Sequence, residues 1–92
     1  MTDSVWFVDI EELSDEYKFK DPLRITIING EPVWAVAGNI RGYGKDEKEA
    51  VANLKEAAHE YYEYLTLNRE SLPQYLSEEL KIFENLLISA QK

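Results

Sequence analysis

The single histidine, His59, is the first residue whose chemistry draws attention. If its segment is helical, Glu56, His59 and Glu63 share one side of the helix, with Glu60 adjacent. Imidazole and carboxylates can bind a metal, or can pair as a general base and the group that orients it. A site on one exposed helix face would be weak, and the sequence identifies no ligand from a second element. We therefore expect a solvated histidine without a metal or catalytic role.

A cluster of carboxylates occupies residues 9–16. Its members are Asp9, Glu11, Glu12, Asp15 and Glu16. A metal-dependent nuclease needs several carboxylates that converge on ions about 4 Å apart. Because these side chains fall in one short segment, solvation and charge explain them better. We expect no catalytic residue, no metal and no cofactor, and therefore no enzyme.

Three glycines, Gly38, Gly42 and Gly44, precede a segment that begins like a helix. A glycine-rich loop before a helix N-terminus can bind phosphate. The spacing here fits neither the dinucleotide fingerprint nor a P-loop, and Asp46 and Glu47 would repel an anion. Tight-turn geometry is the better interpretation of these glycines.

The charge of the chain limits its partners. There are 18 acidic and 10 basic residues, which gives a formal net charge of -8. Nucleic-acid binding draws much of its affinity from phosphate neutralisation, so direct binding to nucleic acid or to an anionic membrane is disfavoured. A basic protein partner suits this charge, which would speed the encounter.

Cysteine is absent, which excludes disulfides and thiolate metal sites. No apolar run approaches the ~20 residues that a membrane span requires. The first residues also lack the basic region of a signal peptide. We expect a cytoplasmic protein.

The elements that must position these residues begin with strands. Residues 4–10 are β-branched and aromatic and predict a strand. Residues 11–21 predict a solvated connection, with Leu13 and Tyr17 spaced for one helical turn.

A β-hairpin is the clearest local signal. Residues 23–28 and 33–38 are apolar and flank Asn29-Gly30, a dipeptide typical of a tight turn. Pro32 has no N–H to donate, so we expect it at a strand start or on an unpaired side.

A helix follows a short third strand over residues 40–43. Asp46 and Glu49 form a capping box. Apolar residues then recur at helical spacing, so the sequence predicts an amphipathic helix over residues 47–65, with alanines first and tyrosines last on its inner face.

A second apolar helix is predicted to start at Ser71 or Ser77 and to reach about Ile88. Residues 1–92 form one domain at this length. The predicted class is α+β: an antiparallel sheet of three to four strands, with a β-β-β-α core. We expect the main helix on one sheet face and the C-terminal helix beside it or in a dimer interface.

Large aromatic residues are numerous for a small domain. If helices cover only one face of the sheet, some of them must face outward. Exposed Trp and Tyr are favoured anchors of protein interfaces. We take Trp6, Trp34 and Tyr43 as candidate partner-binding residues.

Residues 24–65 resemble the HicB-like antitoxin domain. The shared pattern is a hairpin, a short strand, a glycine turn and a capped helix. The residues that carry the resemblance are Gly42, Gly44, Asp46, Glu49, Ala50, Asn53 and Leu54. The segment before the turn, residues 38–41, is shorter than is usual in the family. Residues after 65 include no basic DNA-binding module of the kind that many members carry.

The resemblance implies part of an RNase H-like fold without nuclease carboxylates. It also implies self-association into a homo-oligomer, a dimer or larger, and pairing with a small basic RNA-cleaving toxin, HicA. We therefore expect an antitoxin-like module that masks such a toxin. The alternatives are an orphan oligomerisation or adaptor domain of the same fold and, from another class, a metal-dependent RNase H-like nuclease.

Overall fold

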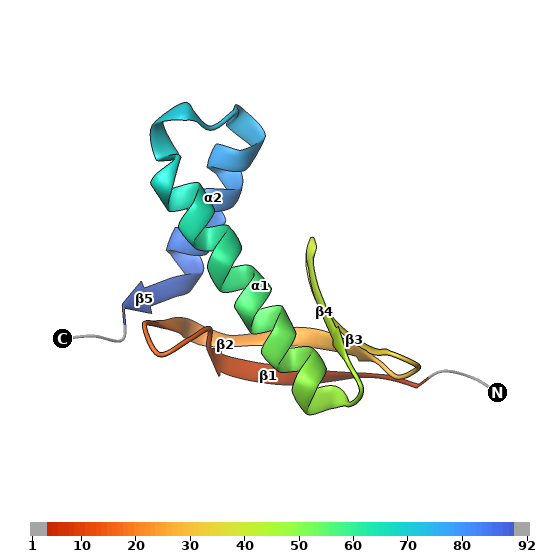
Figure 1. Ribbon diagram of the computed structural model, residues 1–92. Helices are drawn as coiled ribbons and strands as arrows, with labels where there is room; N and C mark the ends of the chain where they lie inside the picture. Colours follow the sequence, from red (N-terminus) through yellow and green to blue (C-terminus); the bar gives the residue numbers. More distant parts are fainter. Residues whose placement is uncertain (1–3, 90–92) are drawn as a thin grey trace.

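The chain is α+β, as the sequence predicts. The computed structural model describes residues 4–89 (Figure 1). In order, the elements are β1 (Val5–Glu12), β2 (Tyr17–Ile28), β3 (Val33–Ala37), β4 (Ile40–Gly44), α1 (Glu47–Leu67), a 3-10 turn (Arg69–Ser71), α2 (Gln74–Leu86) and β5 (Leu87–Ser89).

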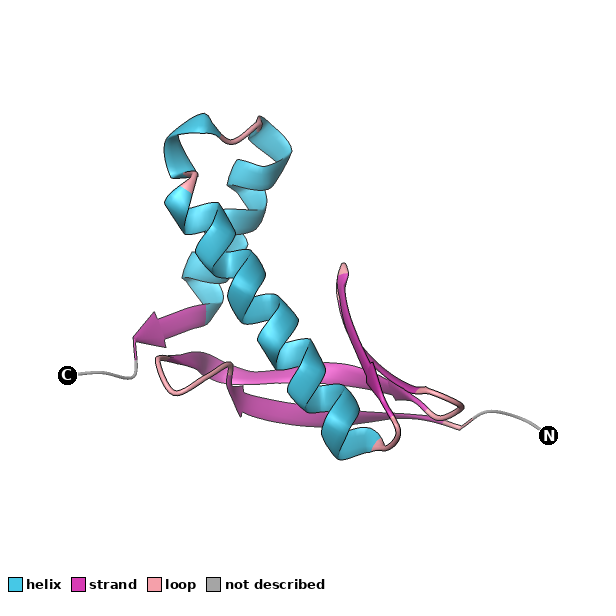
Figure 2. Cartoon of the chain, viewed as in Figure 1, coloured by secondary structure: helices cyan, strands magenta, loops and turns pink. Residues whose placement is uncertain are grey.

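The sheet is antiparallel and follows the order β1-β2-β3-β4. Strand β2 is 12 residues long, so it can pair with β3 near its end and with β5 near its start. Both helices lie on the same side of the sheet (Figure 2), and α1 crosses it diagonally before extending beyond it. The β3–β4 hairpin curves toward the helices.

The core lies between the sheet and α1. Alternate residues of the central strands point toward the helix, and Ile25, Ile27 and Ala35 are almost fully buried there. Ala50 and Leu54 of α1 are buried against them. The core is thus a single layer. On one side it has β-branched residues at alternate strand positions, and on the other it has small or branched residues at helical spacing.

Glycines let α1 pack unusually close to β4. A Cβ at Gly42 would lie 2.2 Å from the Leu54 backbone nitrogen and 2.6 Å from the Ala50 carbonyl oxygen. A Cβ at Gly44 would lie 2.6 Å from the Glu49 Cβ. The tight-turn interpretation is therefore wrong for Gly42 and Gly44, which allow close packing within and beside β4. Among the described residues, only Gly38 has a positive φ, of 61°, and lies in a turn.

The predicted cap of α1 is confirmed. The Asp46 carboxylate accepts a hydrogen bond of 2.9 Å from the Glu49 backbone N–H. The Glu49 carboxylate accepts one of 2.8 Å from the Lys45 N–H, one residue earlier than the usual capping box. The helix begins at Glu47, and these contacts satisfy backbone donors that helix formation leaves free.

The tight Asn-Gly turn predicted between β2 and β3 is wrong. Residues 29–32 connect the strands, with a cis Glu31–Pro32 bond, and Gly30 has no positive φ. A two-residue turn would have placed Pro32 opposite Ile27, inside the ladder. Proline has no N–H for that position, and the longer loop leaves it just outside β3.

The connection predicted over residues 11–21 is also wrong in part. Strand β1 continues to Glu12, and β2 already begins at Tyr17. Leu13 is buried, and its N–H donates to the Tyr17 carbonyl oxygen at 2.9 Å. The spacing of Leu13 and Tyr17 therefore closes a hairpin loop and forms no helical turn.

The second helix starts and ends differently from the prediction. Neither Ser71 nor Ser77 is the N-cap, because Pro73 precedes a helix that starts at Gln74. The helix ends at Leu86, and β5 then pairs with Tyr17–Phe19 of β2. Pairing with a strand far away in the sequence overrides the apolar pattern that suggested helix up to Ile88.

The close approach at Gly42 predicts a large effect of a single methyl group. We expect Gly42→Ala to lower the free energy of unfolding by about 3 kcal/mol, because backbone atoms cannot yield to the new Cβ. Gly30→Ala is the matched control, since its Cβ would be 3.5 Å from the nearest atom, with an expected change within about 0.5 kcal/mol. Urea unfolding of both variants checks this, and equal losses would contradict it.

Candidate functional site

The sheet face opposite the helices is uncovered by the described residues. Gly42 touches α1, so its neighbour Tyr43 points to the other side of β4. In the sheet, Tyr43 of β4 is paired with Trp34 of β3, and Trp34 is paired with Ile28 of β2. Ile28 is in turn paired with Val5 of β1. Because paired residues share a face, these four side chains form one row across all four strands.

A second row follows on the same face. It consists of Phe7, Thr26, Val36 and Arg41. Phe7 is 60% exposed and Tyr43 is 58% exposed. The Trp34 and Tyr43 rings pack together with centroids 5.3 Å apart. Apart from Thr26 and Arg41, the two rows are apolar or aromatic. We call this surface the open face, and exposed apolar surfaces of this kind mark interaction sites.

Charges on the open face lie at its margin. Arg24 stands 5.9 Å above the Phe7 ring and 3.4 Å from the Asp9 carboxylate. Arg41 lies at the edge on β4. The open face therefore has an apolar centre and a mixed polar rim, as interfaces commonly do.

The predicted partner-binding residues divide between two faces. Trp34 and Tyr43 meet on the open face, whereas Trp6 does not join them. Trp6 pairs with Ile27 on the helix side, and its indole N–H donates to the Glu47 carboxylate at 2.7 Å. Strand alternation could have separated Trp6 from the other two only if the register had been known.

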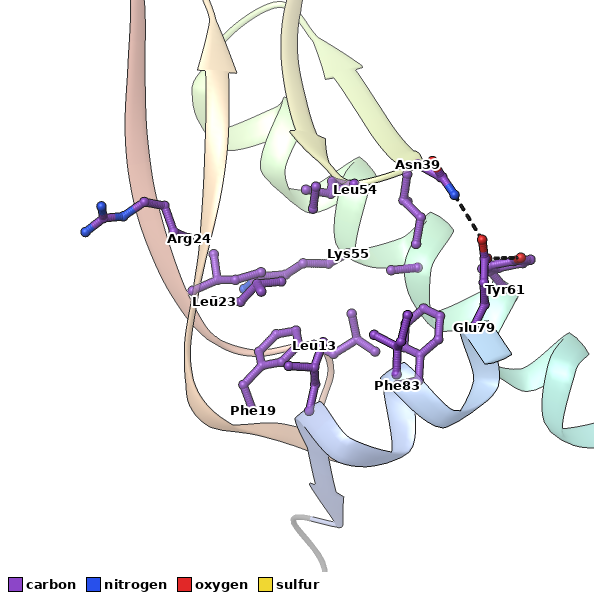
Figure 3. Close-up of a pocket in the computed structure, with 17 residues that line it drawn as sticks. Leu13, Phe19, Leu23, Arg24, Asn39, Leu54, Lys55, Tyr61, Glu79 and Phe83 are labelled. Atoms are coloured by element: carbon purple, nitrogen blue, oxygen red, sulfur yellow. Dashed lines mark hydrogen bonds between the residues drawn. The ribbon is translucent and has the colours of Figure 1, made fainter. Parts of the chain in front are cut away.

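A groove of about 360 Å³ lies on the helix side, between β2, the β3–β4 turn and both helices (Figure 3). Its walls are largely apolar, and the Lys55 side chain reaches across it toward Leu23 while Arg24 points away. Its apolar lining includes Leu13, Phe19, Leu23, Ile40, Phe83 and Leu86. Sequence reasoning missed this groove because it depends on how α2 returns to the sheet.

One rim of the groove is held by a polar contact between three elements. The Glu79 carboxylate of α2 accepts a hydrogen bond from the Tyr61 hydroxyl and one of 2.9 Å from the Asn39 amide in the β3–β4 turn. Burial, together with the hydrogen bond to Glu79, raises the pKa of Tyr61 from 10.0 to about 12. The contact fixes α2 relative to α1 and the hairpin.

His59 has a ligand-type neighbour that the sequence did not reveal. Its Nε2 lies 3.1 Å from the Glu16 carboxylate in the β1–β2 loop and 3.5 Å from the Glu63 carboxylate on α1. Its ring also lies beside Tyr17, with centroids 5.7 Å apart. Glu56, which helical spacing had placed with His59, is not in this group.

The acidic residues of the N-terminal hairpin do not gather into a nuclease-type centre. Asp9 pairs with Arg24 on the open face, whereas Glu16 contacts His59 on the helix side. Within residues 4–89, the one group of metal-ligating side chains that lie together is Glu16, His59 and Glu63. Asp9 and Glu11 do not belong to it.

The residues that carry the family resemblance meet in one contact between β4 and α1. Gly42 and Gly44 receive the helix, and Asp46 and Glu49 cap it. The Asn53 amide donates to the Tyr43 carbonyl oxygen at 2.7 Å. Ala50 and Leu54 fill the buried side. Each of these residues therefore has a packing or capping role.

Comparisons with protein families, with curated proteins and with solved structures found no match to this chain. In the described part of the chain, neither helix combines the length and the apolar character needed to traverse a lipid bilayer.

The raised pKa of Tyr61 predicts a loss of stability at high pH. The folded state holds this proton more tightly than the unfolded state, so its contribution is complete below pH 10.0 and is lost as the pH rises to about 12. We expect urea unfolding to show a smaller fall over this range in Tyr61→Phe than in the wild type.

Tyr43→Phe is the control for this experiment, because Tyr43 is 58% exposed on β4 and does not contribute to the pKa of Tyr61. Its profile should follow that of the wild type. A Tyr61→Phe variant that loses as much stability as the wild type between these pH values would contradict the assignment.

Proposed function

We propose that the chain is a protein-binding module of the HicB-like antitoxin type, which binds and masks a small basic ribonuclease. The observation that carries this proposal is the open face, where Trp34 and Tyr43 stand among aliphatic side chains without cover from either helix. Burying such residues against a partner gives the apolar contact that holds most protein complexes together.

Charge supports a basic partner. The net charge of -8 is carried in large part by the helices, and α1 has more acidic than basic side chains. Its charged residues are Glu47, Glu49, Glu56, Glu60 and Glu63, with Lys48 and Lys55. A toxin that binds RNA needs a basic surface. Its positive charge and the negative charge of this chain would attract each other over long range. Long-range attraction would bring the partners together, and the open face would hold them.

Inhibition by masking needs no chemistry from this chain. A protein that covers the RNA-binding surface of a ribonuclease blocks it sterically and also replaces the phosphates with its own acidic groups. The close β4–α1 contact supports the family assignment, since all the residues that suggested it take part in that contact or its cap.

The alternative is an oligomerisation or adaptor domain without a toxin. The open face favours this reading too, because its rim carries Asp9 as well as Arg24 and Arg41 and so does not repel a second copy. The nuclease alternative gains no such support, because Asp9 and Glu11 do not join the group of ligand-type side chains around His59.

Capture from the native cell tests the proposal. The expected partner is a small basic protein that cleaves RNA by itself and stops doing so when this chain is added. Trp34→Ala should weaken the complex about 30-fold, as expected for loss of an interface anchor worth about 2 kcal/mol. Titration calorimetry and an RNA-cleavage assay measure the two effects.

The matched control is Leu67→Ala, which removes an 85% exposed apolar side chain from α1 instead of the open face. It should leave the affinity unchanged. If Trp34→Ala changes only the mass of the isolated chain in light scattering and no ribonuclease is inhibited, the oligomerisation alternative replaces the antitoxin assignment.

A further inference from the structure

We propose that Glu16, His59 and Glu63 form a binding site for a divalent transition-metal ion, with Zn²⁺ as the best-suited ion. This inference is independent of the antitoxin proposal. It arises from a meeting of two elements: the β1–β2 loop supplies Glu16, and α1 supplies His59 and Glu63 at i and i+4. A ligand from a second element is what the helix face alone lacked.

The distances fit one small ion. Zinc bonds to nitrogen and oxygen are about 2.0–2.2 Å long, so neighbouring ligands of a tetrahedral site lie about 3.3–3.6 Å apart. His59 Nε2 lies 3.1 Å from Glu16 and 3.5 Å from Glu63, and the three ligand atoms all fall within 4.8 Å of one another. The two His59 distances are already close to these values, and the Glu16 and Glu63 oxygens, which lie within 4.8 Å of each other, would move together by up to about 1 Å.

The ligand types select the class of ion. One imidazole nitrogen and two carboxylates suit Zn²⁺ and its neighbours, whereas Mg²⁺ and Ca²⁺ prefer oxygen ligands only. Two carboxylates and a neutral imidazole balance the charge of a divalent ion. With three protein ligands, a fourth position stays available for water or for a group from a partner.

The ligands are already held near their positions. His59 is about one-quarter exposed, and its ring lies beside Tyr17, whose own ring packs edge-on against Tyr62. The Glu16 backbone N–H donates a hydrogen bond of 3.2 Å to the Ser14 hydroxyl oxygen, and this hydrogen bond constrains the loop. A bound ion would therefore fasten the β1–β2 loop to the middle of α1.

The experiment uses the tag-free chain after treatment with a chelator. Titration calorimetry with ZnCl2 should show one ion per chain, with MgCl2 giving no comparable signal. Saturating Zn²⁺ should raise the thermal unfolding midpoint by at least about 4 °C. Co²⁺ should give the visible absorption of a four- or five-coordinate site, which reports ligands directly and not stability.

Variants assign the ligands. His59→Gln and Glu16→Gln should each weaken Zn²⁺ binding about 100-fold and abolish the Co²⁺ spectrum. Glu56→Gln is the matched control, since it removes a carboxylate one turn from His59 that is outside the group, and it should bind like the wild type. Circular dichroism confirms that each variant is folded.

Two results would overturn the site. One is the absence of saturable Zn²⁺ binding by the wild type at one ion per chain. The other is an equal loss of Zn²⁺ affinity in Glu56→Gln and Glu16→Gln. That result would mean that Zn²⁺ binds through the overall negative charge around α1 and not through these three ligands.

Discussion

The contact between α1 and β4 determines the arrangement of the rest of the molecule. Gly42 and Gly44 have no side chains, so the helix backbone comes within a distance that any Cβ would block. That contact commits α1 to one face of the sheet and fixes its direction across the strands. Ala50 and Leu54 then fall over Ile27 and Ala35, and the core forms in a single layer. The opposite face stays without a covering element in residues 4–89.

The length of α1 has a second effect. The helix is 21 residues long and extends beyond the sheet, as Figure 1 shows, so its last turns need another partner. Helix α2 supplies it: Leu65 and Leu80 are buried, and Phe83 packs on the Tyr61 and Tyr62 rings. Because α2 returns at an angle to the sheet, the space between them remains partly unfilled and becomes the apolar groove.

Sequence reasoning found the features that are encoded locally. The cap at Asp46 and the start of α1 depend on residues close together in the chain, and both could be predicted. It failed where distant segments decide the outcome. Strand β5 forms only by pairing with β2, and Glu16 could be placed beside His59 only in three dimensions. The predicted tight turn was a local error, because Pro32 has no N–H for the ladder position that such a turn would give it. Of the open face, only Trp34 and Tyr43 were foreseen, because alternation identifies exposed positions only when the covered face is known.

The pairing of β5 with β2 has a consequence for how the chain folds. It joins Leu87 to Phe19, so this short ladder closes a loop that contains most of the described chain. Contacts between residues so distant carry a high loop-closure entropy and form late. The hairpin of β3 and β4 with α1, by contrast, uses near neighbours and can assemble early. Amide hydrogens of β5 should consequently exchange with solvent through a local opening that leaves the α1 layer intact.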